Sequence, residues 1–113
     1  MEFKKLNQIN QLNEIDFQSH SKLQAIFKHS TRCSVSRMAK QILSEELESN
    51  KDELIDIYYL DLISYREISN EIASRYFLQH ESPQILFIKD GKCIYHASHS
   101  DVSIEKSLRE MAR

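Results

Sequence analysis

Short apolar runs alternate with helically spaced apolar residues along almost the whole chain, and this alternation restricts the possible folds. Runs of β-branched and apolar residues are typical of buried strands, whereas recurrence every three to four residues is typical of amphipathic helices. The pattern predicts the element order βαβαβαββα. Because strand–helix alternation gives parallel strands and a final hairpin adds antiparallel ones, we expect an α/β fold with a central mixed β-sheet flanked by helices.

Particular runs place these elements along the chain. Strands are predicted over residues 3–6, 23–27, 54–60, 84–88 and 92–97, and the run 54–60 is expected to be a central strand. Helices are predicted over residues 9–17, 34–47 and 64–76, with a last helix from Ser100 or Asp101 to 111. Ser64 and Glu67 have the spacing of a capping box. Asp90-Gly91 is a favoured hairpin turn.

Composition and charge exclude several classes of protein. The 113 residues are expected to form one domain, 1–113, and 15 basic against 17 acidic residues give a net charge of −2 without a basic face for nucleic acid. No apolar run approaches the ~20 residues of a membrane span. Two cysteines without framework spacing argue against a secreted disulfide scaffold, and the N-terminus lacks an apolar signal core. We therefore expect a cytoplasmic protein.

Cys33 lies in the polar segment 28–36, directly before a predicted helix. The free N–H groups and the dipole of a helix N-terminus favour an anion, so the placement predicts a nucleophilic thiolate. The alternative is a buried and inert cysteine, and the polar surroundings argue against it. Ser36 occupies the position of the second cysteine in a Cys-x-x-Cys pair. The chain is therefore predicted to act through one cysteine.

The element order and a few short motifs resemble a known family. The segment 27–36 (FKHSTRCSVS), followed by Ser82-Pro83-Gln84 and Asp90-Gly91-Lys92, is similar to the signature of the YtxJ family, the BrxC-type monothiol bacilliredoxins of the thioredoxin-like superfamily. That family commonly has proline where this chain has Ser34. The resemblance implies a thioredoxin-like fold and a thiol–disulfide oxidoreductase. Cys33 would remove bacillithiol from protein mixed disulfides, with bacillithiol as redox co-substrate and no permanently bound cofactor.

Residues around Cys33 have predicted roles in this reaction. Ser36 can donate a hydrogen bond to the thiolate, although an ordinary early-helix serine is an equal alternative. Arg32 can add positive charge beside the thiol or bind the malate carboxylates of bacillithiol, as can helix N–H groups, against the alternative of a solvated surface charge. Thr31 and Ser34 complete the predicted binding loop.

Two further segments are predicted to complete the substrate site. Pro83 is expected to be cis and to lie against Cys33, as the matching proline does in the thioredoxin fold, which leaves the backbone of Ser82 to pair with an extended substrate. The alternative is a trans proline that opens an edge strand. Asp101, with Ser100, can meet the amine of bacillithiol, or the two residues can simply cap the last helix.

The remaining cysteine and the histidines carry weaker signals. Cys93 follows the hairpin turn, so strand length places it far from Cys33 and predicts a structural thiol. The histidines lack the spacing of a metal site, and no metal is expected. Expected partners are bacillithiol and bacillithiolated client proteins, without nucleic acid or membrane, and the protein is expected to be a monomer. A glutaredoxin-like protein for another small thiol and a non-catalytic thioredoxin-like binding module are the alternatives.

Overall fold

The computed structural model describes residues 2–49 and 54–113 and confirms the predicted α/β element order. Each predicted strand and helix is present, with ends that differ by a few residues. In chain order the elements are β1 (Lys4–Lys5), α1 (Gln11–Gln18), β2 (Leu23–His29), α2 (Ser34–Ser49), β3 (Ile55–Asp61), α3 (Arg66–Arg75), β4 (Gln84–Lys89), β5 (Lys92–Ser98), the 3₁₀ turn η1 (His99–Asp101) and α4 (Ile104–Met111).

The strands form one mixed sheet in the order β1-β3-β2-β4-β5. Strand β3 runs parallel to β1 and β2, whereas β4 runs antiparallel to β2 and β5. The strand predicted over residues 54–60 is thus an inner strand, but β2 is the central one. The register pairs His29 with Asp61 and Lys28 with Gln84, so the end of β2, the end of β3 and the start of β4 share one edge of the sheet.

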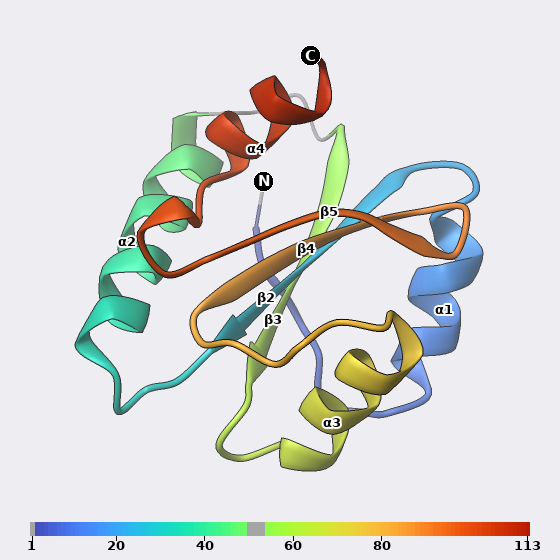
Figure 1. The fold of residues 1–113 in the computed structure, drawn as a ribbon, viewed down its shortest axis with the longest axis horizontal. Helices are drawn as coiled ribbons and strands as arrows, with labels where there is room; N and C mark the ends of the chain where they lie inside the picture. Colours follow the sequence, from blue (N-terminus) through green and yellow to red (C-terminus); the bar gives the residue numbers. More distant parts are fainter. Residues whose placement is uncertain (1, 50–53) are drawn as a thin grey trace.

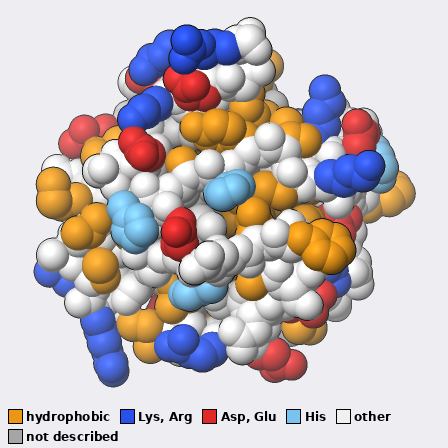
Figure 2. Space-filling view, in the orientation of Figure 1, with side chains coloured by type: hydrophobic (Ala, Val, Ile, Leu, Met, Phe, Trp, Pro, Cys, Tyr) orange, Lys and Arg blue, Asp and Glu red, His pale blue; other side chains and the backbone are white. Residues whose placement is uncertain are grey.

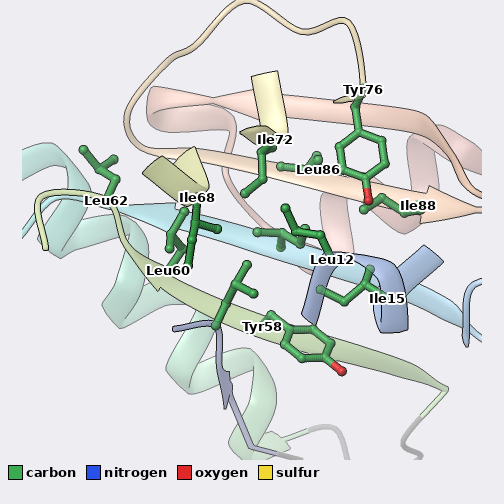
Figure 3. Packing of buried hydrophobic residues seen from close by; sticks show 12 residues of the cluster. Leu12, Ile15, Tyr58, Leu60, Leu62, Ile68, Ile72, Tyr76, Leu86 and Ile88 are labelled. Carbon is green, nitrogen blue, oxygen red and sulfur yellow. The ribbon is translucent and has the colours of Figure 1, made fainter. Parts of the chain in front are cut away.

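Helices cover both faces of the sheet (Figure 1). Helices α1 and α3 pack on one face, and Figure 3 shows their apolar side chains meeting those of the strands. Helices α2 and α4 pack on the other face. Because both faces are covered, strands β2 and β4 are buried along nearly their whole length, as their continuous apolar runs predicted.

Helix α2 buries only half of its predicted apolar stripe. Ala39, Leu43 and Leu47 pack against the sheet. Val35, Met38 and Ile42 lie on the adjoining side and are 44%, 65% and 42% exposed. Figure 2 shows hydrophobic side chains at the surface over α2, on the left of the view.

The predicted starts of the last two helices are wrong. Ser64 does not cap α3, because its hydroxyl donates to Asp61 Oδ2 at 2.9 Å and its backbone N–H points to Asp61 Oδ1. Helix α4 begins at Ile104 rather than at Ser100 or Asp101, since η1 intervenes. The side chain of Ser103 accepts from Lys106 N and is the N-cap.

The hairpin turn has the geometry that its sequence predicts. Asp90 and Gly91 have φ angles of +52° and +74°, which a two-residue type I′ turn requires and glycine adopts without strain. Ser19, directly after α1, accepts hydrogen bonds from both turn N–H groups, at 3.1 Å and 2.8 Å. Among the described residues, no helix has the length and apolar composition needed to cross a membrane.

Candidate active site around Cys33

Cys33 is a partly exposed free thiol at the N-terminus of α2. Its carbonyl accepts the first helical hydrogen bond from Arg37 N at 3.0 Å, so Cys33 is the N-cap residue of α2. Its own N–H donates to Ser30 O at 3.2 Å, which closes a tight turn over residues 30–33. Cys33 therefore lies at the end of α2 where the N–H groups of the first helical turn are free.

Ser36 ties this turn to the first turn of α2. It is fully buried, and its Oγ accepts a hydrogen bond from Ser30 N at 3.0 Å and pairs with His29 Nδ1 at 2.7 Å. These two bonds fix the ends of the Cys33 loop relative to the helix. The predicted contact between Ser36 and the Cys33 thiolate stays a prediction.

His29 ends β2 under the same loop and is 2% exposed. Its ring lies between Phe27 and Tyr59, with both centroid distances at 5.5 Å. Burial lowers the pKa of His29, and the positive charges of Lys40 and Arg37 act in the same direction, while Ser36 and Asp61 oppose them. The bond between His29 and Ser36 joins β2 to α2 and depends on the tertiary fold.

Pro83 lies at the same edge of the sheet and follows a cis peptide bond, as predicted. The carbonyl of Pro83 accepts a hydrogen bond from His99 N at 3.0 Å, which brings η1 to the start of β4. The side-chain oxygen of Ser82 is buried and has no hydrogen-bond partner among the described residues. Ser82 and Pro83 therefore lie at the end of the sheet where β2 leads into the Cys33 loop.

Ser100 and Asp101 lie in η1, exposed, beside this edge and next to α2. Asp101 pairs with Lys106 at 2.6 Å, and this bond lowers the pKa of the Asp101 carboxyl. Ser100 and Asp101 therefore lie in the segment next to α2, and neither is the N-cap of α4. Their contact with a substrate stays a prediction.

The loop residues Thr31, Arg32 and Ser34 are exposed around Cys33. The Arg37 guanidinium donates to Thr31 O at 3.2 Å and so holds the loop from the helix side. Sequence reasoning assigned no role to Arg37 or Lys40. Their spacing, four and seven residues after Cys33, was the available signal, because it places both cations on successive turns of one helix.

A second buried group lies at the same edge on the opposite face. Lys28 is fully buried in β2, and its Nζ is 2.8 Å from His80 Nδ1. Burial lowers the pKa of Lys28 to about 8. Its placement follows from β alternation, since residues next to each other in a strand face opposite sides.

Cys93 lies at the far end of the sheet from Cys33. It pairs with Ile88, whereas Ser98 at the other end of β5 pairs with Gln84 beside Pro83. The Cys93 thiol packs against the core on the α1 and α3 face, and burial raises its pKa. This register confirms the predicted separation of the two cysteines. Within residues 2–49 and 54–113, no three His, Cys, Asp or Glu side chains are grouped to hold a metal ion.

Fold and site together define a thiol–disulfide oxidoreductase of the thioredoxin fold. Three solved structures share this fold. A protein described as a candidate oxidoreductase with a thioredoxin fold has a TM-score of 0.80 and 27% identity over 96% of this chain and 92% of that one. Thioredoxin of Malassezia sympodialis has a TM-score of 0.72 and 16% identity over 98% and 86%. Thioredoxin of Schistosoma mansoni has a TM-score of 0.69 and 22% identity over 98% and 95%.

A family model assigns the chain more narrowly. The model for the monothiol bacilliredoxin BrxC matches residues 4–107. The chain therefore belongs to the monothiol bacilliredoxin family, which confirms the resemblance seen in the sequence.

Proposed function

We propose that this protein removes bacillithiol from protein mixed disulfides, with Cys33 as the nucleophile. The observation that carries the proposal is a partly exposed cysteine at the N-cap of α2, with buried Ser36 where a resolving cysteine would stand. A mixed disulfide on Cys33 then has no neighbouring thiol to resolve it, and membership of the monothiol bacilliredoxin family supports the choice of bacillithiol.

The reaction proceeds by two thiol–disulfide exchanges. The Cys33 thiolate attacks the bacillithiol sulfur, the bond from that sulfur to the client sulfur breaks, and the client leaves as a thiolate that takes up a proton. A second thiol, such as free bacillithiol, loses its proton and attacks the bacillithiol sulfur on Cys33. This step forms a small-molecule disulfide and returns the Cys33 thiolate. One S–S bond replaces another in each step, so no bound cofactor is needed.

The surrounding residues have proposed binding roles. The exposed side chains of Thr31, Arg32 and Ser34 would contact the small thiol as it approaches Cys33. The Ser82–Pro83 segment would pair with the client backbone. Ser100 and Asp101 in η1 would face the sugar amine of bacillithiol, in competition with the ion pair between Asp101 and Lys106.

We also propose a cytoplasmic monomer as the active form. Both cysteines are free thiols, which suits a reducing compartment. All the proposed site residues come from one chain, so a single copy carries the complete site.

Intact mass spectrometry tests the proposed reaction. The protein is incubated with a client protein that carries bacillithiol on one cysteine, and both masses are followed over time. We expect the client to lose bacillithiol while Cys33 gains it. Cys33→Ser should abolish the transfer, whereas Cys93→Ser should leave it nearly unchanged. A client that stays modified, with no adduct on the wild-type protein, would exclude the reaction and favour a binding module. Equal rates with glutathione and coenzyme A mixed disulfides would remove the assignment to bacillithiol.

A further inference from the structure

A solvent-open hollow of about 460 Å³ lies along α2 beside the Cys33 loop. The end of β2, the loop and the first three turns of α2 contribute its walls. Its lining residues are His29, Thr31, Arg37, Lys40, Gln41 and Ser44. The lining contains two cations, two hydroxyls, an amide and an imidazole, and no carboxylate.

The two cations of the hollow are held in place without an acidic partner. Arg37 is anchored by its bond to Thr31 O, and Lys40 Nζ lies 4.9 Å from the centre of the Tyr59 ring. Neither forms an ion pair with any residue of the described ranges. Asp61, the nearby acid, is bound to the N–H groups of Ile63 and Ser64. The positive charge of the hollow is therefore available to a ligand.

His29 adds a polar ring atom to this surface. Its Nδ1 is bonded to Ser36, so Nε2 is the ring atom left for a ligand. When Ser36 donates to Nδ1, the neutral ring carries its proton on Nε2 and becomes a hydrogen-bond donor. The hollow then presents donors from three side chains, Arg37, Lys40 and His29, and such a set suits an oxygen-rich anion.

The hollow is within reach of a molecule joined to Cys33. Thr31 is two residues before Cys33, and Arg37 lies one helical turn after it. Lys40 lies about 10 Å along the helix axis from Cys33, at the rise of an α-helix. A thiol with its carboxylates beyond a sugar spacer can therefore place them between Arg37 and Lys40.

We propose that this hollow binds the malate carboxylates of bacillithiol, with Arg37 and Lys40 as their ligands and His29 Nε2 as an additional donor. This inference rests on the proposed function, and it assigns the malate carboxylates to Arg37 and Lys40 instead of Arg32. It makes the hollow a specificity site, because a thiol without carboxylates gains nothing from it.

Steady-state kinetics tests the assignment on the intact protein. The substrates are one peptide carrying either bacillithiol or cysteamine as its mixed disulfide, since cysteamine has no carboxylate. For Arg37→Gln with Lys40→Gln we expect KM for the bacillithiol peptide to rise roughly tenfold or more, with kcat nearly unchanged. KM for the cysteamine peptide should rise much less, because any effect of losing the bond between Arg37 and Thr31 is common to both peptides. Lys89→Gln with Lys92→Gln, the same loss of two positive charges at the exposed hairpin, is the matched control.

Binding of L-malate alone gives a readout that does not depend on turnover. In NMR titrations of the imidazole nitrogens, we expect malate to shift the His29 signals and to raise the pKa of His29, because it neutralises the nearby cations. The double variant should lose both effects.

The two proposals fail in different ways. If the wild-type protein does not act on the bacillithiol peptide, the proposed function fails. The malate titration then still tests whether the hollow binds carboxylates. If the wild-type protein turns over and the double variant keeps its KM, the hollow is not the malate site. An equal KM rise for the cysteamine peptide, or no shift of the His29 signals with malate, would equally overturn it.

Discussion

Ser36 holds the loop that presents Cys33, and this task is separate from any contact with the thiolate. In its buried position the hydroxyl accepts from Ser30 N and pairs with His29. A serine in place of a second cysteine thus removes the resolving thiol and also fastens the loop. The same residue type can serve both purposes because a hydroxyl both donates and accepts.

Ser36→Ala should lower the free energy of unfolding by about 1–3 kcal/mol, because it leaves the partly buried N–H of Ser30 and the buried ring of His29 without their partner. Urea denaturation measures this loss. Ser34→Ala, at an exposed neighbouring position, is the control and should change stability by less than about 0.5 kcal/mol. Equal stability of the Ser36→Ala variant and the wild type would contradict the anchoring role.

Lys28 should make stability depend on pH. Its pKa is about 8 in the folded chain and near 10.4 when exposed to water. Below pH 8 the ammonium is charged in both states, so the full cost of burying it is present. Between pH 8 and about 10.4 the unfolded chain binds more protons than the folded one, and stability rises with pH.

Lys28→Met should therefore raise the free energy of unfolding at pH 7, by about 1–3 kcal/mol, and this advantage should shrink at pH 9.5. Urea denaturation of both proteins at the two pH values gives the comparison. Lys92→Met, at an exposed position, should show neither effect. If the difference in free energy of unfolding between the two proteins stayed constant with pH, the charge of Lys28 would not be the cause of the lower stability.

At the scale of elements, α4 depends on α2 for its start. Glu46 of α2 accepts from Ile104 N at 2.8 Å, from Glu105 N at 3.1 Å and from the Ser103 hydroxyl at 2.7 Å. A carboxylate at a helix N-terminus binds its free N–H groups and interacts favourably with the helix dipole. Two helices far apart in sequence are thereby joined on one face of the sheet.

Glu46→Ala should cost about 1–2 kcal/mol of stability and increase amide exchange in the first turn of α4. Hydrogen-exchange mass spectrometry resolves that segment, and denaturation gives the total cost. Glu48→Ala removes an exposed carboxylate from the same helix and should leave exchange in α4 unchanged. If both variants raise exchange equally, general loss of negative charge, not capping, is responsible.

At the scale of the whole molecule, the sheet separates the two thiols. Cys93 pairs near the hairpin end of β4, and the Cys33 loop follows the opposite end of β2. The four residue-to-residue steps from Gln84 to Ile88 span roughly 13 Å, whereas a disulfide needs Cα atoms within about 7 Å. We therefore expect the two thiols not to form a disulfide with each other in the folded protein.

Oxidation of the folded protein with diamide should give no Cys33–Cys93 disulfide. Peptide mapping under non-reducing conditions checks this, with the urea-unfolded chain as the control in which the bridge can form. A bridge that forms in the folded protein would show that β5 leaves the sheet, and it would make Cys93 a resolving cysteine.

The sequence alone determined the element order, the mixed sheet, the hairpin turn and the place of Cys33, because these depend on local periodicity and on the conformational preferences of Asp90, Gly91 and Pro83. The matching signature also placed the chain in its family. Features that depend on local sequence were therefore predictable. The position of Cys93 at the hairpin end of its strand, far from Cys33, is one of them.

Only the tertiary structure decided which side chains meet. The bond of Ser36 to His29, the cap that Glu46 gives to α4 and the hollow that His29 and Lys40 line each bring together residues from separate elements. The exposure of Met38 within a regular apolar stripe also depends on which neighbour covers α2. Such contacts depend on how elements pack in three dimensions, and the spacing of residues along one element carries no record of that packing.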